Sequence, residues 1–207
     1  MKPQTIINIV FAAVFVGYVV SQRNPTFDII TCKTWIVVDP EGKERILAFT
    51  NPDGLASVQW RDKDGKKRIS ASTLTDGEAS VAWFDKDGKK RIVAGTLANG
   101  SASVGWIDKD EKVRIGASTV ANGNASVQWF DKDEKIRISA KTLANGNASV
   151  EWLDKDEKAR ISAATLAAGT AGVAWFDKDG KQRIGAGISA DGTVVLPTED
   201  LNPPKKP

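Results

Sequence analysis

Six tryptophans recur at intervals of 23 residues, and this period constrains the fold more than any other feature of the sequence. In every copy a valine lies two residues before the tryptophan, an aspartate two residues after it and an arginine eight residues after it. Repeats of this length indicate one supersecondary unit that stacks on copies of itself. The tryptophans are Trp60, Trp83, Trp106, Trp129, Trp152 and Trp175.

The two ends of the array are atypical. A degenerate copy comes first, in which Trp35 occupies the usual valine position and Val37 the usual tryptophan position. At the other end, Leu196 stands where the next valine would be. Terminal units of stacked arrays depart from the consensus because they lack one neighbour. The sequence therefore predicts a repeat domain of one degenerate and six regular units over residues 35–196, followed by a Pro-rich tail over residues 197–207.

Each unit contains two runs with strand character and two turn signals. In the second full copy the runs cover residues 79–85 and 91–97, and they are separated by Asp87-Gly88 and followed by Asn99-Gly100. Asp-Gly and Asn-Gly tolerate the positive φ of hairpin turns. Parallel strands need crossovers of a dozen residues or more, so these short links predict an all-β antiparallel meander of tandem β-hairpins.

The register of this meander follows from its two turns. If the Asp-Gly pair is the centre of its turn, Trp83 pairs with Ile92 and Val81 with Ala94. If the Asn-Gly turn is a three-residue loop with a left-handed glycine, Ile92 pairs also with Trp106. Both turns place the same side chains on the same face, as a consistent register requires.

One face is uniform from copy to copy, and we call it the Trp face. It carries Ala, Val and Trp from one strand and Ile, Ala and Thr from the next, whereas the opposite, variable face changes: Gln59, Ala82, Gly105, Gln128, Glu151 and Ala174 share one position. The uniform face is expected to be buried. Its predicted core or oligomer interface comprises the six tryptophans with Val81, Val104, Val127, Val150, Ile92, Ile115, Ile138 and Ile161.

A single-layer meander has nothing to cover such a face, because an apolar sheet face must pack against another layer. We expect a homo-oligomer, preferably a homotrimeric β-prism with the Trp faces inward, that forms a rod or filament. Two sheets packed face to face, or one chain coiled on itself, remain open. Fourteen strands spaced about 4.8 Å apart give a rod about 65–70 Å long.

Composition excludes most familiar active sites. Histidine is absent and Cys32 is the single cysteine, which removes the commonest general base and metal ligand and any intrachain disulfide. Cys32 is interpreted as a small half-buried hydrophobe, with a link between two chains as the alternative. The net charge of +3 comes from interleaved charges without a basic patch, so no nucleic-acid partner is predicted.

The first 25 residues have the character of a membrane segment. They hold an apolar run from residue 6 to residue 20 between Lys2 and Arg23. We interpret residues 1–25 as a short hydrophobic helix that anchors the chain, and residues 26–34 as a linker; a cleavable signal peptide is the alternative. Either interpretation predicts export. The predicted membrane-facing residues are Ile6, Ile9, Val10, Phe11, Val14, Phe15, Tyr18 and Val19.

The Asp-Lys-Asp-Gly turns resemble a fragment of a calcium loop. Calcium needs six to eight oxygens, yet lysines lie among these carboxylates and Glu111, Glu134 and Glu157 replace the glycine in three copies. We therefore interpret them as plain turns, in which the aspartate bonds the loop backbone. The arginine after the turn, such as Arg91, is expected to cover Phe84 and to meet Asp85.

The unit from Trp83 to Gly100, hydrophobic-x-Asp-x-Asp-Gly-Lys-x-Arg followed by Asn-Gly, resembles tandem repeats of poorly characterised exported bacterial proteins. Many of these also carry a short N-terminal hydrophobic segment. The resemblance covers residues 35–196 and implies a fold type but no catalytic residue.

The expected function is structural and non-enzymatic: a membrane-anchored cell-surface rod or filament subunit whose partner is itself. No cofactor, metal site, catalytic residue or small-molecule substrate is predicted. The alternative is an extracellular binding module that presents the variable face, including Phe84, Phe130 and Phe176, to a glycan or protein. A Trp row open to solvent would instead be a stacking platform for glycans or single-stranded nucleic acid.

Overall fold

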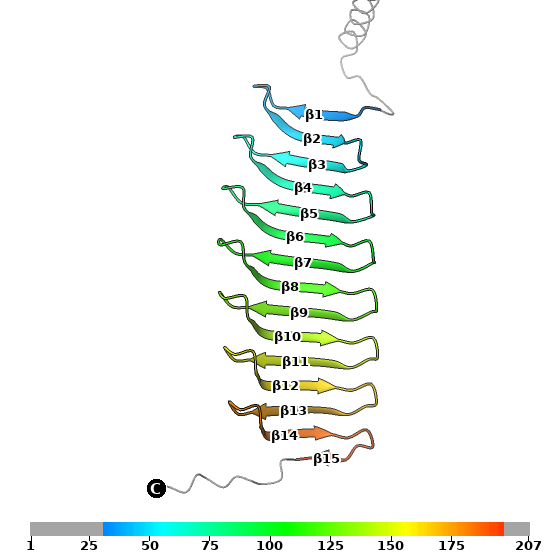
Figure 1. Cartoon of the computed structure of the whole chain (residues 1–207), viewed down its shortest axis with the longest axis vertical. Coiled ribbons are helices and arrows are strands. Elements are labelled where there is room, and N and C mark those ends of the chain that lie inside the picture. The colour runs from blue at the N-terminus through cyan, green and yellow to red at the C-terminus, as the bar shows by residue number, and fades with distance from the viewer. Residues whose placement is uncertain (1–30, 197–207) are drawn as a thin grey trace, which may run out of the picture. The chain divides into compact units, whose positions relative to one another are not determined.

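The computed structural model describes residues 31–196, which form one antiparallel sheet of fifteen strands in chain order (Figure 1). The strands are β1 (Thr34–Val38), β2 (Glu44–Thr50), β3 (Ala56–Arg61), β4 (Lys67–Thr73), β5 (Ala79–Phe84), β6 (Lys90–Thr96), β7 (Ala102–Ile107), β8 (Val113–Thr119), β9 (Ala125–Phe130), β10 (Ile136–Thr142), β11 (Ala148–Leu153), β12 (Ala159–Thr165), β13 (Ala171–Phe176), β14 (Gln182–Ile188) and β15 (Val194–Val195). Each strand pairs only with its sequence neighbours. The predicted all-β meander of tandem β-hairpin repeats is confirmed.

The predicted register is confirmed on both sides of each strand. Trp83 of β5 pairs with Ile92 of β6, and Ile92 pairs in turn with Trp106 of β7. Val81 pairs with Ala94 in the same hairpin. Because side chains alternate along a strand, this register places all the repeated Val, Trp and Ile residues on the Trp face.

The Asp turns produce the predicted register through a loop and a bulge that the sequence did not predict. The loop is closed by Asp85, whose N–H donates to the Lys89 carbonyl over 2.9 Å, so it contains three residues and not two. A β-bulge next to the turn, where Phe84 pairs with Lys90 but Trp83 pairs with Ile92, inserts Arg91 as an extra residue. The longer loop and the bulge compensate each other, which is why the strand pairing still matches.

The Asn-type turns have the predicted three-residue loop. The N–H of Leu97 donates to the Ser101 carbonyl over 2.8 Å, and Gly100 occupies the left-handed position at φ +84°. The two turn types lie at opposite ends of the strands (Figure 1). We call these ends the Asp-turn edge and the Asn-turn edge.

A hydrophobic core is missing from the described residues of this single chain. Within residues 31–196 no apolar side chain is fully buried, and the six repeated tryptophans remain 36–40% exposed. Cys32 is also exposed, so the expectation of a half-buried cysteine was wrong; one layer of sheet offers no interior to bury it. A sheet with one apolar face is stable only when a second layer packs against that face, and this sheet does not supply that layer itself.

The predicted membrane segment, the start of the linker and the Pro-rich tail lie outside the described residues. Over residues 31–196 there is no helix long and apolar enough to cross a membrane.

A glycine pair tests the turn geometry. Gly100→Ala is expected to destabilise the protein by about 1 kcal/mol, because an L-residue is strained at this positive φ. Gly105→Ala is the control: its φ is not positive and an added Cβ would meet no atom within 4 Å. Urea unfolding followed by circular dichroism compares the two variants. A Gly105 variant as unstable as the Gly100 variant would contradict this account of the loop.

Candidate functional site

The Trp face is built from three columns of side chains that run across the strands. The column beside the Asp-turn edge contains Trp from one strand and Ile from the next, as in Trp83 and Ile92. The middle column alternates Val with Ala, and the column beside the Asn-turn edge alternates Ala with Thr. We call the first column the Trp ridge.

A groove of about 920 Å³ lies over the half of this face that carries the small side chains. It crosses β7 to β13, and its lining includes Val104, Ala117, Thr119, Val127, Ala140 and Thr142. No tryptophan or isoleucine lines it. From β7 to β13 the Trp face therefore has a half with large side chains and a hollow half with small ones.

The predicted interface residues all lie on this one face. The tryptophans and isoleucines form the ridge, Val104, Val127 and Val150 line the groove, and Val81 lies on the same face outside it. Sequence reasoning identified the face but not the groove. The signal was present, however, because alanine and threonine recur with the same period as tryptophan.

The variable face is more polar and its apolar residues are partly covered. The Lys67 ammonium lies 4.6 Å from the centre of the Phe84 ring, in cation–π range. Lys141 and Glu151 pair across neighbouring strands at 3.3 Å. Charged side chains thus cover part of the variable face, whereas the Trp face of the described strands carries none.

At the Asp-turn edge the first aspartate of each loop organises the turn. In the third full copy, Asp108 Oδ1 accepts hydrogen bonds from the N–H groups of Asp110 and Lys112 over 2.8 and 3.0 Å. Its Oδ2 accepts one from Arg114 Nε over 2.7 Å. Both oxygens are used within the protein, as a plain turn requires, and residues 31–196 contain no group of three or more acidic or cysteine side chains placed to hold a metal ion.

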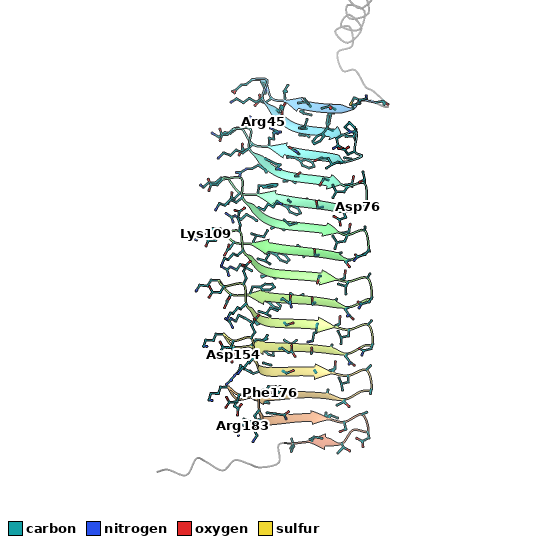
Figure 2. All side chains as sticks on the ribbon, viewed as in Figure 1. Arg45, Asp76, Lys109, Asp154, Phe176 and Arg183 are labelled. Atoms are coloured by element: carbon teal, nitrogen blue, oxygen red, sulfur yellow. The ribbon has the colours of Figure 1, made fainter. Side chains whose placement is uncertain are left out.

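The same edge connects each hairpin to the next. Arg91 donates to Asp85 in its own turn and to the Asp108 carbonyl in the following turn. Lys89 Nζ donates to the Lys109 carbonyl of that turn over 3.0 Å. Figure 2 shows the charged side chains gathered along this edge, including Lys109 and Asp154. The contact of Arg91 with Asp85 was predicted, whereas the bonds to the following turn were not.

The Asn-turn edge has a similar connection in two copies. Asn124 Oδ1 accepts from the N–H of Ala144 over 2.8 Å, and Asn147 Oδ1 accepts from the N–H of Ala167 over 2.9 Å. Both bonds join one turn to the next. The sheet is therefore held along both edges as well as by its strand pairing.

Acid should weaken the Asp turns. The pKa of Asp131 falls from its ordinary 3.8 to about 2: partial desolvation, the largest single influence, raises it, but hydrogen bonds from Lys135 N–H, Arg137 and Asp133 N–H together outweigh that effect. The folded state thus binds the proton more weakly than the unfolded chain, so the stabilisation is complete above the ordinary pKa and disappears as the pH falls through the folded one.

We expect a melting temperature that is level between pH 7 and pH 5 and falls between about pH 4 and pH 2, measured by circular dichroism. The pKa of the equivalent aspartate is lowered in the other six Asp turns: Asp39, Asp62, Asp85, Asp108, Asp154 and Asp177. Asp131→Asn should make the decline shallower. A melting temperature unchanged at pH 2 would contradict the role assigned to these carboxylates.

Comparison with known proteins gives a fold-level likeness only. Neither a known protein family nor a curated protein matches the chain. Among solved structures, the chain is similar to the SAS-4 (dCPAP) TCP domain of Drosophila melanogaster, solved in complex with a proline-rich motif of Ana2 (dSTIL). The identity is 12% and the TM-score 0.46, over 86% of this chain and 97% of that one.

Proposed function

We propose that this chain is a structural, non-enzymatic protein: a membrane-anchored surface rod or filament subunit whose copies assemble by burying the Trp face. The observation that carries the proposal is the Trp ridge, whose six tryptophans stay 36–40% exposed on a sheet that has no core within residues 31–196. Burying an aromatic side chain contributes roughly 1.5–3 kcal/mol, and six such rings recur along one face. Copies of the same chain supply a matching apolar surface without a second protein.

The size of the apolar face also favours assembly. The fourteen strands β1 to β14, about 4.8 Å apart and each presenting about 17 Å of length, give a face of about 1,100 Å². The largest apolar patch on a typical monomer is about 300–600 Å². A face of this size buried on each partner exceeds the standard protein interface of about 800 Å² per partner.

Anchoring and export rest on the apolar run that precedes the repeats, from residue 6 to residue 20. A single trans-bilayer or interfacial segment would hold one end of the rod at a membrane. The bonds between successive turns, such as Arg91 to the Asp108 carbonyl, suit a rigid rod because they resist bending between one hairpin and the next.

A matched pair of substitutions tests the proposal in the full-length chain kept in mild detergent. Ala117→Arg places a charge in the middle column of the Trp face, while Gln128→Arg places it on the variable face of the neighbouring strand, at a residue that does not line the groove. Light scattering should give a multiple of the chain mass for the wild type and the Gln128 variant, and the single-chain mass for the Ala117 variant. Wild-type tryptophan emission should be blue-shifted and poorly quenched by acrylamide.

A binding module is the second candidate, favoured by the change of side chains along the variable face from copy to copy. On that account the wild type is a monomer, and its tryptophans are open to the quencher. The Gln128 variant would then lose a ligand while the Ala117 variant keeps it. A monomeric wild type with fully quenched tryptophans would end the rod proposal.

A further inference from the structure

The two halves of the Trp face are complementary in shape. The ridge of Trp and Ile occupies the half beside the Asp-turn edge, and the groove of about 920 Å³ occupies the half beside the Asn-turn edge. A ridge as long as the sheet lies parallel to a groove that crosses seven strands, from β7 to β13. Such a surface can fit a copy of itself.

We propose that the occupant of the groove is the Trp ridge of a second copy of this chain, in a parallel pair of facing sheets. The two copies are related by a two-fold axis that runs along the stacking direction of the strands, above the middle column. Each ridge then lies in the partner's groove. This inference rests on the proposed assembly through the Trp face and specifies its geometry.

Symmetry selects this arrangement over the antiparallel one. Rotation about the stacking direction exchanges the two edges of the sheet, so the ridge of one copy faces the groove of the other. Rotation about the strand direction keeps each edge on its own side, so ridge faces ridge and groove faces groove. The second case forces the indoles against one another and leaves both grooves unfilled, at a loss of packing contacts.

Residue sizes agree with the parallel pair at each level. On β9 the two-fold axis places Trp129 opposite Ala125 of the other copy and Val127 opposite itself. On β10 it places Ile138 opposite Thr142 and Ala140 opposite itself. Large side chains thus face small ones across a gap of about 10 Å, the usual spacing of packed sheets.

The small middle column distinguishes a pair from a three-sheet prism. In a prism the middle column of each sheet points at the central axis, which lies farther away than half the spacing of a facing pair. Alternating Val and Ala, as at Val127 and Ala140, are too short to fill that space and would leave a void along the axis. In a facing pair the same short residues let the two sheets approach.

Spin-label distances in the full-length chain test the orientation. Cys32→Ser removes the native thiol, and Asp53→Cys or Ala190→Cys then places one label on an exposed Asn-edge turn near either end of the sheet. The parallel pair predicts about 25–30 Å between labels at both positions, from the width of the sheet. The antiparallel pair predicts about 50–55 Å for position 53 and about 60 Å for position 190.

The measured mass and the label distances together support or contradict the parallel pair. A mass of two chains with short distances at both positions supports the proposal. A dimer with the long distances, or a mass of three chains, overturns the parallel pair but leaves assembly through the Trp face intact. A monomer shows that the proposed function itself has failed. If the Gln128→Arg control dissociates the dimer and Ala117→Arg does not, the pair uses the variable face, and the inference is wrong.

Discussion

Replacing Trp106 and Trp129 together by alanine is expected to weaken self-association by about a millionfold, because a symmetric pair loses four rings. Both rings are 36–40% exposed in a single chain, and another copy can bury most of this exposed surface. Aromatic residues at the centre of an interface cost at least about 2 kcal/mol each when truncated, which is about thirtyfold per ring. Sedimentation equilibrium of the full-length chain over a concentration series measures the change.

The matched control lies on the other face of the same hairpins. Ile107→Ala with Phe130→Ala removes two large side chains that directly follow the two tryptophans in sequence and point to the variable face. This variant should associate like the wild type. Equal weakening in both double variants would show that the sheet assembles through both faces or that either change disrupts the strand itself, and the special role of the Trp face would be lost.

The fold was predictable because the residues that determine each hairpin are close together in sequence and recur in every copy. The pairing of Trp83 with Ile92 follows from a turn of known type and from alternation along the strand, and the same evidence recurs every 23 residues. An error in the predicted length of one loop would shift the register in every copy unless it were compensated within the same hairpin. At the Asp turn a longer loop and the bulge at Arg91 cancel, so the register was right although the loop was not.

The contacts between hairpins were not predictable in the same way. Arg91 and Asp108 are 17 residues apart, and Arg91 is the extra residue of a bulge that the sequence did not predict. The recurrence of the arginine indicated a structural role but not its second acceptor. The groove was not predictable for a related reason: the sequence places alanine and threonine on the Trp face, but the groove forms only where seven strands lie side by side.

The bonds between turns lead to a position-dependent effect of one substitution. Arg114 donates to Asp108 in its own turn and to the Asp131 carbonyl in the next, and its side chain is 28% exposed. Arg183, in the last full hairpin, bonds Asp177 of its own turn and is 59% exposed. The two arginines occupy equivalent sites in the repeat, but only Arg114 has a further Asp turn beside it to bond.

Arg114→Gln is therefore expected to lower the free energy of unfolding by about 2 kcal/mol, because two charge-assisted hydrogen bonds are lost and the Asp108 carboxylate is left without its cation. Arg183→Gln should cost less than about 1 kcal/mol, as for an exposed ion pair. Urea unfolding at one fixed protein concentration measures both. Arg114→Lys should recover little of the loss, since one ammonium cannot reach both acceptors in the geometry of the guanidinium. Equal losses at the two positions would mean that the bond to the following turn contributes nothing, and that the hairpins are coupled by strand pairing alone.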